Sequence, residues 1–312
     1  MRRTNIGIVG VGKIARDQHI PVIRGDGRFS LVAGASRNAT VDGVRNFSDL
    51  EAMLEGMADI DAVSICTPPQ THFEAVKLAL LHKKHVLLEK PPCTTTAELA
   101  HLARLAKDAG RVLYQTWHSR HAAGVAPARE WLAARKLRAV RVIWKEDVRQ
   151  WHPGQTWIWK AGGFGVFDPG INAISILTEI LPEPFFVARA HLKTPSNCQS
   201  PIAADIGFAA GSGARIEAEF DFRHTGIQTW DIDIETDKGT LKLSLGGSRL
   251  FIDGAEKRIP GGERPHGEYE SVYGRFADLV ERGQSDVDAG PFQLVADCFL
   301  VATHETVEPF QD

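Results

Sequence analysis

The feature that most constrains the fold lies at the start of the chain, where an apolar run is followed at once by a glycine-rich turn. Asn5–Gly10 predicts a buried strand, and residues 10–15 continue as Gly-Val-Gly-Lys-Ile-Ala. In this pattern the first glycine permits a tight turn and the second lets a pyrophosphate approach the backbone, while the small third residue permits close helix–strand packing. The N–H groups of the helix that opens here point at the phosphates. We therefore predict a dinucleotide site that includes Gly10, Gly12, Lys13 and Ile14.

The second predicted strand bears on which dinucleotide the turn binds. It covers Ser30–Ser36, and folds selective for NAD usually carry an acidic residue at its end that hydrogen-bonds the adenosine ribose. This chain has Ser36, Arg37 and Asn38 instead, and a guanidinium beside a hydroxyl suits a ribose 2′-phosphate. We therefore expect NADP to be preferred, with NAD as the second cofactor. The alternative is that Arg37 lies on the adenine face and selects neither.

Strands and helices then alternate, which predicts a doubly wound parallel sheet. Besides the strands above, the pattern predicts strands at 62–66 and 112–116, and helices at 49–54 (capped by Ser48), 73–81 and from Thr94–Thr96 to Gly110. Thr67, Pro68 and His72 follow the strand at 62–66, so we expect them to line a cofactor cleft at the carboxyl edge of the sheet. The alternative for His72 is a helix-start residue without chemistry.

The segment His85–Pro92 carries the first candidate for catalysis. Its three consecutive apolar residues predict a short buried strand, which two charged residues and two prolines terminate. Lys90 then lies at the carboxyl end of a parallel strand, where open α/β sheets bind their ligands. A partly desolvated ammonium there can orient a hydroxyl or stabilise charge that develops on oxygen. From these residues alone, the alternative is a Glu89–Lys90 pair that only decorates a loop.

Composition argues against several classes of function. The net charge of −3 over 312 residues gives no electrostatic reason to expect nucleic acid, and no basic tract suggests an anionic membrane. Four cysteines lack Cys-x-x-Cys spacing and twelve histidines lack the His-Glu-x-x-His pattern, so neither a metal site nor a disulfide framework is predicted. No leader and no apolar run near 18 residues is apparent, so we expect a soluble, cytoplasmic protein.

From about Trp117 the pattern changes to a run of strands. A helix is expected within 123–135, strands at 140–148, 187–192, 203–210, 214–222, 228–236, 239–244 and 249–252, and helices at 268–282 and 290–307. Glycine-containing turns between successive strands fit hairpins. We therefore predict an α/β protein with a Rossmann doubly wound parallel sheet in residues 1–120. Residues 121–312 are expected to form an α+β domain with a large, mostly antiparallel sheet, whose final helices are candidates to pack back on the first domain.

Four motifs occur in order at suitable spacing: Ile6–Ala15, Ala35–Arg37, Cys66–His72 and Glu89–Pro91. Together they resemble the glucose–fructose oxidoreductase/inositol dehydrogenase (Gfo/Idh/MocA) family. The resemblance implies that Lys90 contacts the substrate and assists catalysis. It also implies that Glu89 and Lys90 border the cofactor and that the Lys90–Pro91 bond is cis.

The second candidate for catalysis is Asp168, in the segment Gly162–Asn172. Asp before proline suits a helix N-cap, so Asp168 has a structural alternative, but a capping carboxylate remains available to accept a proton. The family pattern here is Gly…Asp-x-x-x-His, in which the Asp contacts substrate and the His is often the acid/base. This chain has Asn172, an amide that cannot titrate, in place of the histidine. With segments 145–153 and 157–160, this combination resembles the L-arabinose/D-galactose 1-dehydrogenases of the family.

This resemblance implies oxidation of an aldopyranose at C1 to a lactone, with the hydride passed to a nicotinamide. Asp168 is the candidate base, Lys90 would hold the C1 oxygen, and Asn172 would orient the hydroxyl or the nicotinamide ribose. Lysine has an ordinary pKa of about 10.4, so a carboxylate accepts a proton more readily at neutral pH, although the assignment between the two residues stays open.

The remaining candidates are polar and aromatic side chains that suit a sugar ring and its hydroxyls. Those for the sugar are His118, Glu146, Trp151, His152 and Trp230, and Trp157 is the candidate for the cofactor; packing is the alternative role for the tryptophans and for His152. Two other functions stay open: a polyol or inositol dehydrogenase, and a nucleotide-binding regulator without turnover. A homo-oligomer through the C-terminal sheet is a further expectation.

Overall fold

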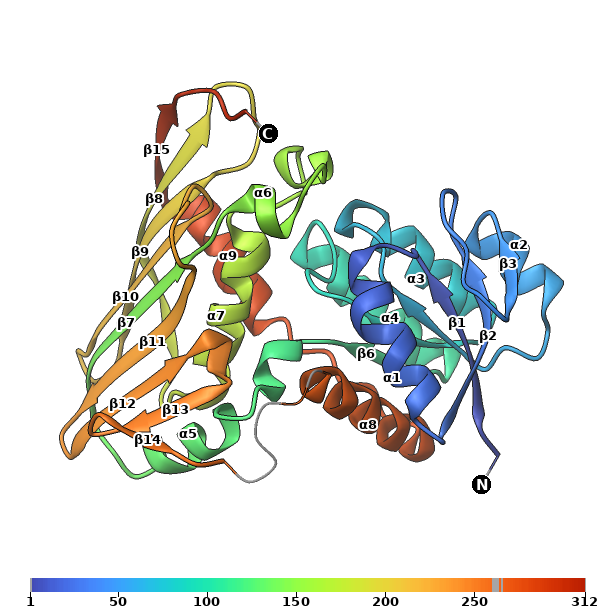
Figure 1. Cartoon of the computed structure of the whole chain (residues 1–312), viewed down its shortest axis with the longest axis horizontal. Coiled ribbons are helices and arrows are strands. Elements are labelled where there is room, and N and C mark those ends of the chain that lie inside the picture. The colour runs from blue at the N-terminus through green and yellow to red at the C-terminus, as the bar shows by residue number, and fades with distance from the viewer. Residues whose placement is uncertain (1, 260–263, 265, 312) are drawn as a thin grey trace. The chain divides into compact units, whose positions relative to one another are not determined.

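The computed structural model describes residues 2–259, 264 and 266–311. The chain divides into two compact units. The first is formed by Met1–Trp117 with His266–Ala289, and the second by His118–Pro265 with Gly290–Asp312. Each unit is built around its own β-sheet (Figure 1).

The first unit contains a six-stranded parallel sheet in the order β3-β2-β1-β4-β5-β6. Its strands are β1 (Thr4–Val9), β2 (Phe29–Ala35), β3 (Arg45–Phe47), β4 (Ala62–Ile65), β5 (His85–Leu88) and β6 (Leu113–Gln115). All four residues of β4 are buried, as expected for a strand covered on both faces. The predicted doubly wound parallel sheet is confirmed, and its strand order is that of dinucleotide-binding folds. The sequence pattern missed β3, which is short and largely exposed.

Helices cover both faces of this sheet. They are η1 (Ala15–His19, a π-helical turn), α1 (Ile20–Gly25), α2 (Leu50–Gly56), η2 (Pro69–Thr71), α3 (His72–Leu81), α4 (Thr96–Ala109) and α8 (Gly267–Arg282). The predicted ends of α4 are confirmed, since Thr95 and Glu98 form a capping box and Gly110 is left-handed with φ 63°. The predicted cap of α2 is wrong by one residue: Asp49, not Ser48, accepts the Ala52 N–H.

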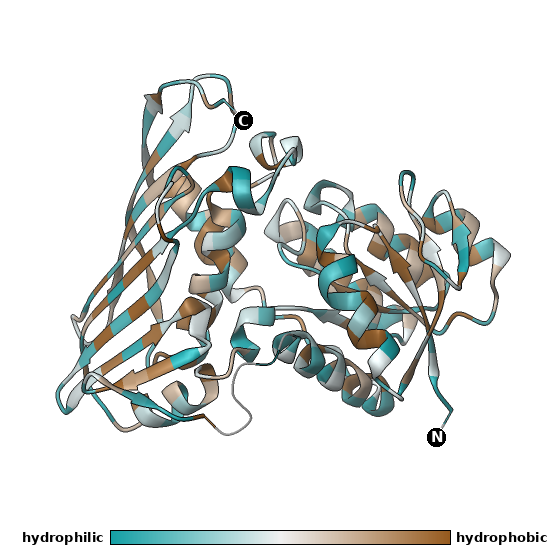
Figure 2. Ribbon diagram, viewed as in Figure 1, coloured by the Kyte–Doolittle hydropathy of each residue, from teal (hydrophilic) through white to brown (hydrophobic). Residues whose placement is uncertain are grey.

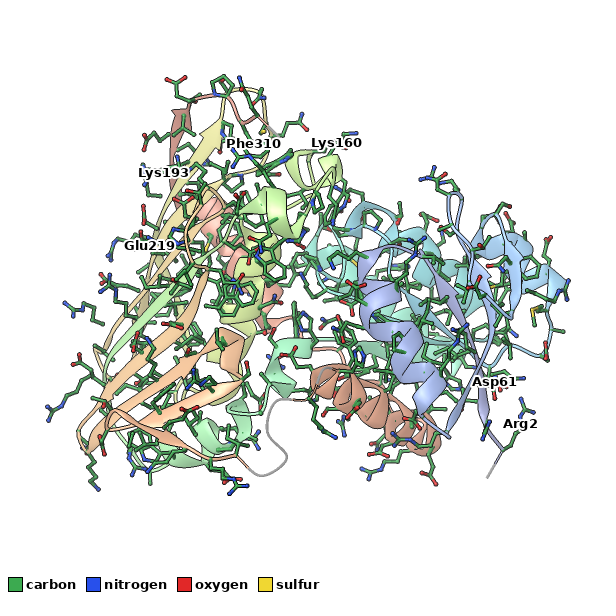
Figure 3. All side chains as sticks on the ribbon, in the orientation of Figure 1. Arg2, Asp61, Lys160, Lys193, Glu219 and Phe310 are labelled. Carbon is green, nitrogen blue, oxygen red and sulfur yellow. The ribbon has the colours of Figure 1, made fainter. Side chains whose placement is uncertain are left out.

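Helix α8 belongs to the first unit although residues 118–265, which precede it in sequence, belong to the second unit. Its apolar side chains enter a core formed with β1, α1, β2, β5 and β6. The members from α8 are Tyr269, Val272, Tyr273, Phe276 and Leu279. At the edge of the sheet where its strands begin, Arg2 Nη2 and Asp61 Oδ1 form an ion pair of 2.5 Å. Both residues are labelled in Figure 3.

The second unit contains a nine-stranded sheet in the order β14-β13-β12-β11-β7-β10-β9-β8-β15. Its strands are β7 (Leu137–Lys145), β8 (Phe185–Pro195), β9 (Ala203–Ala210), β10 (Arg215–Asp221), β11 (Thr229–Thr236), β12 (Gly239–Ser244), β13 (Arg249–Ile252), β14 (Ala255–Lys257) and β15 (Ala302–Val307). Six of its eight strand pairs are antiparallel, which confirms the predicted mostly antiparallel sheet. The sequence pattern missed β14.

One face of this sheet is packed against helices and the other carries charged side chains. The helical segments of the unit are η3 (His118–His121), α5 (Val125–Leu132), α6 (Val148–Trp151), η4 (Thr156–Trp159), α7 (Phe167–Ile180), η5 (Leu245–Gly247) and α9 (Gly290–Val301). Figure 2 shows apolar and polar residues alternating along the strands, and Figure 3 shows Lys193 and Glu219 on the face away from α7 and α9. Ion pairs such as Lys193–Asp205 (3.1 Å) lie on that open face.

Two predicted elements of the second unit are wrong. Residues 302–307 do not continue α9 but form β15, which pairs in parallel with β8, because the edge of the sheet supplies backbone partners that local periodicity does not reveal. The strand predicted to run to Val148 ends at Lys145, and Asp147 instead caps the short helix α6 by accepting the Arg149 N–H. Across the described ranges, no helix combines the length and hydropathy needed to cross a bilayer.

Candidate active site

The glycine turn after β1 forms the first part of the candidate site. Gly10 has φ +85°, and a Cβ at this position would lie 2.8 Å from Thr67 Cγ2 and 3.0 Å from the Cys66 carbonyl group. Only glycine therefore fits, since the left-handed backbone and the neighbouring strand end both exclude a side chain. At Gly12, by contrast, a Cβ would meet nothing within 4 Å, so the backbone faces open space. The helical segment that follows carries Lys13, which pairs with Asp17, and the exposed Ile14. This cradle fits the pyrophosphate of a dinucleotide.

The end of β2 carries the residues predicted to choose between the cofactors. The Ser36 N–H donates to the Phe47 carbonyl (3.0 Å), which fixes the backbone at the end of this strand. Arg37 is exposed, and no side chain in the described part of the protein hydrogen-bonds its guanidinium. A guanidinium that stays uncommitted in the protein is available to an anionic ligand.

The ends of β4 and β5 are tied together by His72. This histidine, at the start of α3, is fully buried, and its ring nitrogens face three backbone carbonyls. Nε2 lies 2.6 Å from the Thr67 oxygen, and Nδ1 lies 3.0 and 3.1 Å from the Pro91 and Pro92 oxygens. Burial lowers the pKa of His72, while the carbonyl groups act in the opposite direction. His72 therefore holds the loop after β4 against the turn after β5, and Thr67 and Pro68 are half-buried residues of the first of these loops.

Lys90 follows the buried strand β5 and is half-buried. The Lys90–Pro91 peptide bond is cis, as the resemblance predicted. The Lys90 N–H donates to Glu89 Oε2 at 3.0 Å, and Glu89 itself is only 3% exposed. Because β1, β2, β4 and β5 are parallel neighbours, the glycine turn, Arg37, Thr67 and Lys90 all follow the carboxyl ends of their strands.

In the second unit, Asp168 lies in the first turn of α7 and is only 3% exposed. It is not the N-cap: Val166 occupies that position, so the structural alternative for Asp168 is wrong. The preceding loop is tight, since a Cβ at Gly165 would lie 2.1 Å from the Pro201 oxygen. It also includes Phe164 at φ +68°, a strained conformation for a residue with a side chain. Helix α7 therefore begins at Phe167, earlier than the Asp-Pro pattern predicted.

Asp168 belongs to a cluster of three polar side chains. His152 Nε2 lies 3.7 Å from Asp168 Oδ2 and 3.6 Å from Glu146 Oε1, distances just beyond a direct hydrogen bond. Glu146 is 3% exposed and follows β7, whereas the side chain of His152, which ends α6, is 18% exposed. Two buried carboxyl groups thus converge on one imidazole edge. Within the described ranges, no group of three or more acidic, His or Cys side chains is arranged to hold a metal ion.

Tryptophans border this cluster. Trp230 on β11 donates its indole N–H to Glu146 Oε2 at 2.7 Å. Its ring centroid lies 5.2 Å from that of Trp151 and 6.0 Å from that of Trp144, which is its partner on β7. The structure therefore brings together five of the predicted residues: Glu146, Trp151, His152, Asp168 and Trp230. An aromatic surface beside hydrogen-bonding groups suits a sugar ring.

Three other predicted residues also belong to the second unit. Asn172 is one turn after Asp168 on α7, and its carbonyl accepts the Ser175 hydroxyl at 2.7 Å. His118 lies in η3, with the Ser119 Oγ 3.4 Å from Nδ1. Trp157 lies half-buried in η4.

Sequence reasoning missed a buried polar cluster next to Lys90. Its members are His19, Ser64, Glu89, Tyr269 and Tyr273, and only Glu89 had been singled out. Their separations along the chain reach 254 residues, so no local signal joins them.

Comparisons with known proteins agree with this architecture. Residues 4–116 match the model of an oxidoreductase family with an NAD-binding Rossmann fold, GFO_IDH_MocA. The chain is 46% identical to the galactose 1-dehydrogenase of Pseudomonas fluorescens, with 100% of both chains covered. A crystal structure of D-galactose-1-dehydrogenase from Rhizobium etli has a TM-score of 0.93 at 51% identity and covers 100% of this chain and 99% of that one. The 3-ketoreductase KijD10 of Actinomadura kijaniata, in complex with NADP and TDP-benzene, has a TM-score of 0.83 at 19% identity over 98% of this chain and 100% of that one; it shares the fold.

Proposed function

Since the chain belongs to the GFO_IDH_MocA family of oxidoreductases, we propose that it oxidises an aldopyranose at the anomeric carbon to the lactone. The candidate substrates are D-galactose and L-arabinose. The observation that carries the proposal is the convergence of buried Asp168 and Glu146 on His152 beside tryptophans. The full-length similarity to two galactose 1-dehydrogenases supports the same substrate class.

The reaction requires that one proton and one hydride leave the sugar. Asp168 accepts the proton of the C1 hydroxyl as the general base. The chemistry that a bound nicotinamide would supply is acceptance of the hydride from C1, which would leave the C1–O bond as the carbonyl of the lactone. Lys90 donates a hydrogen bond to the C1 oxygen and stabilises the negative charge that develops on it.

The other residues of the proposal bind and orient the sugar. Asn172, an amide that cannot take up the proton, orients the hydroxyl or the cofactor ribose. Glu146 and His152 hydrogen-bond further ring hydroxyls, and Trp151 and Trp230 offer apolar surface to the C–H face of the ring. His152 Nε2 lies 3.6–3.7 Å from the two carboxyl groups, so all three side chains border the same space. His118 and Trp157 are proposed to border the sugar and the cofactor, respectively.

The cofactor side of the proposal rests on the first unit. The backbone at Gly10 and Gly12 would hold the pyrophosphate, and Thr67 and Pro68 would border the nicotinamide half. Ser36 and the uncommitted Arg37 suit a ribose 2′-phosphate, so NADP is proposed as the preferred cofactor and NAD as the second.

The substrate class is tested by initial rates of cofactor reduction with D-galactose, L-arabinose, D-xylose and myo-inositol, using both NADP and NAD. Reduction with D-galactose or L-arabinose supports the proposal. Reduction with myo-inositol alone would point to a polyol dehydrogenase instead, and no reduction with any of them would favour a regulator that binds the dinucleotide without turnover.

The role of Asp168 is tested by Asp168→Asn, which keeps the shape of the side chain but removes the proton acceptor. We expect kcat to fall by about 10²-fold or more with the affinity for NADPH nearly unchanged. Asp205→Asn is the matched control, because Asp205 pairs with Lys193 on the open face of the sheet. Loss of NADPH affinity in Asp168→Asn, with the control unaffected, would mean that Asp168 acts on the cofactor and not on the sugar proton.

A further inference from the structure

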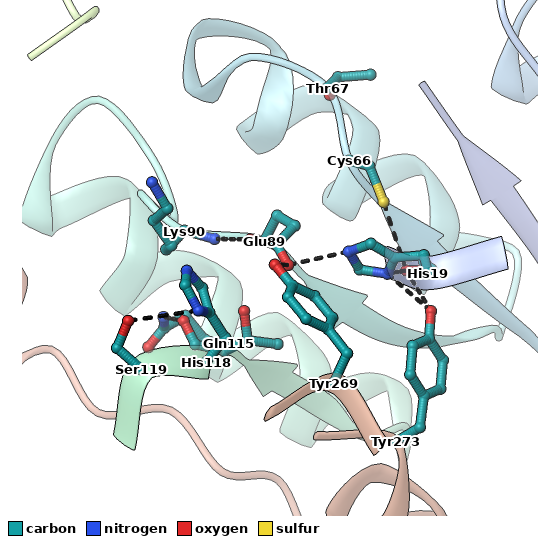
Figure 4. A network of polar contacts seen from close by, with 12 residues as sticks. His19, Cys66, Thr67, Glu89, Lys90, Gln115, His118, Ser119, Tyr269 and Tyr273 are labelled. Atoms are coloured by element: carbon teal, nitrogen blue, oxygen red, sulfur yellow. Dashed lines mark hydrogen bonds and ion pairs between the residues drawn. The ribbon is translucent and has the colours of Figure 1, made fainter. Parts of the chain in front are cut away.

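A buried polar cluster lies next to Lys90 and has no part in the reaction as derived so far (Figure 4). It joins residues from four elements: His19 on η1, Ser64 on β4, Glu89 after β5, and Tyr269 and Tyr273 on α8. All five side chains are buried in the first unit, where an unneeded charged group would be destabilising. Packing alone therefore does not explain why these polar side chains are buried together.

Glu89 is the centre of the cluster because both of its oxygens accept hydrogen bonds. Oε1 lies 3.0 Å from His19 Nε2 and accepts the Tyr269 hydroxyl at 2.9 Å. Oε2 accepts the backbone N–H of Lys90 at 3.0 Å. An ionised carboxylate can accept all three, whereas a neutral amide offers only one oxygen. The carboxylate thus connects the buried cluster directly to the main chain of Lys90.

His19 supplies the counter-charge. Burial by itself lowers the pKa of His19, but Cys66, Tyr273 and the hydrogen bond to Glu89 outweigh burial, and the pKa is raised well above its ordinary value. Its Nδ1 faces Tyr273 Oη at 2.8 Å and Ser64 Oγ at 3.1 Å. His19 lies on the helical segment that follows the glycine turn, so the same ring connects that segment to the Lys90 strand.

We propose that Glu89 is a positioning residue, which holds the Lys90 main chain in its working place and is itself held by His19 and Tyr269. The proposal rests on the proposed function, in which the Lys90 ammonium bonds the C1 oxygen. A group misplaced by about 1 Å can lose about 10²-fold in rate, so loss of this anchor acts on turnover. Through Glu89, hydrogen bonds also link His19, on the helical segment after the glycine turn, to the main chain of Lys90.

A purely structural role predicts something different. A buried ion pair kept only for the fold affects stability when broken, while the surviving folded molecules turn over normally. A positioning role lowers kcat in folded protein and leaves the dissociation constant for NADPH unchanged.

The two tyrosines of α8 provide a matched pair of variants. Both are buried, and replacement by phenylalanine removes one hydroxyl in each case, but only the Tyr269 hydroxyl donates to Glu89. In Tyr269→Phe we expect kcat to fall about three- to tenfold, and in Glu89→Gln about tenfold or more, with NADPH affinity retained. Tyr273→Phe leaves both hydrogen bonds of Glu89 Oε1 in place, so its kcat is expected to fall less than that of Tyr269→Phe. Equal kcat in the parent, Tyr269→Phe and Glu89→Gln would overturn the proposal.

Hydrogen exchange at the Lys90 amide reports the same contact without turnover. Glu89→Gln and Tyr269→Phe should speed this exchange about tenfold relative to Tyr273→Phe, because the bond from the Lys90 N–H to the side chain of residue 89 weakens. Unchanged exchange in both variants would overturn the positioning role whatever the rates show.

Lys90→Met separates this proposal from the proposed function. If Lys90→Met retains turnover, Lys90 has no catalytic role. The fall in kcat expected for Glu89→Gln and Tyr269→Phe is then refuted as well. If Lys90→Met is inactive while Glu89→Gln turns over normally, the proposed function stands and only the role of Glu89 falls. In the double variant Glu89→Gln/Lys90→Met, no loss beyond that of Lys90→Met alone is expected, and a full additional loss would refute action through Lys90.

Discussion

The two glycines of the turn after β1 lead to opposite expectations for the same substitution. At Gly10 the backbone has φ +85°, and an alanine Cβ would lie 3.0 Å from both the carbon and the oxygen of the Cys66 carbonyl. The left-handed conformation costs an L-residue about 1–2 kcal/mol. Contact with backbone that cannot rotate away adds about 1–3 kcal/mol. Gly10→Ala is therefore expected to lower the free energy of unfolding by roughly 2–5 kcal/mol.

At Gly12 an alanine Cβ would meet no protein atom within 4 Å. Gly12→Ala should therefore leave the free energy of unfolding within about 0.5 kcal/mol of the parent value. The added methyl group would instead occupy the space through which a pyrophosphate approaches the backbone, so we expect the affinity for NADPH to fall at least about tenfold.

Both variants are measured in the same two assays: urea unfolding followed by tryptophan fluorescence, and titration of the native protein with NADPH and NADH. The reasoning fails if Gly12→Ala binds both dinucleotides like the parent protein, because the pyrophosphate then does not lie over this turn. A parent-like unfolding midpoint for Gly10→Ala would show that the strand ends relax around a side chain there.

Two further substitutions test local electrostatics. In Arg37→Ala the preference for NADP over NAD, measured as the ratio of kcat/KM values, should fall several-fold, and an unchanged ratio would contradict selection by this guanidinium. Burial and Arg111 lower the pKa of His85 to about 4, and its Nδ1 accepts the Val112 N–H at 3.0 Å, so the folded protein favours the neutral ring. The stabilisation is then complete above about pH 6.5 and lost as the pH falls towards 4. After discounting for the exposure of the half-buried ring, we expect about 1–2 kcal/mol of acid destabilisation that His85→Asn lacks. Equal acid destabilisation of both proteins in urea unfolding at pH 7.5 and 4.5 would rule out this residue as the cause.

Local signals predicted the elements whose ends are determined by neighbouring residues. The capping box of Thr95 and Glu98 and the left-handed Gly110 bound α4 at both ends within the sequence itself. The cap of α2 shows the limit of such signals, because Ser48 and Asp49 are both good caps, and the side-chain geometry selected Asp49. At β15, a partner strand at the sheet edge overrode the apolar pattern that favoured a longer helix.

The residues of the candidate site also fall into two groups: those that local sequence signals predicted and those whose place depends on tertiary packing. The glycine turn, Arg37 and Lys90 were predictable because each follows a parallel strand, and parallel strands end at one edge. The sequence pattern singled out Asp168, but its place inside the first turn of α7 depends on the loop at Phe164–Gly165 packing against Pro201. The approach of His152 to both Glu146 and Asp168 likewise depends on three separate elements.

By itself, the sequence determined the parallel sheet, the dinucleotide turn and the family, because each rests on short motifs that can be recognised one by one along the chain. The tertiary structure alone decided that Glu89 would be met by His19, Tyr269 and the Lys90 N–H. The physical reason is burial: a carboxylate excluded from water must find donors wherever the fold brings them, and here two of those donors come from positions 70 and 180 residues away.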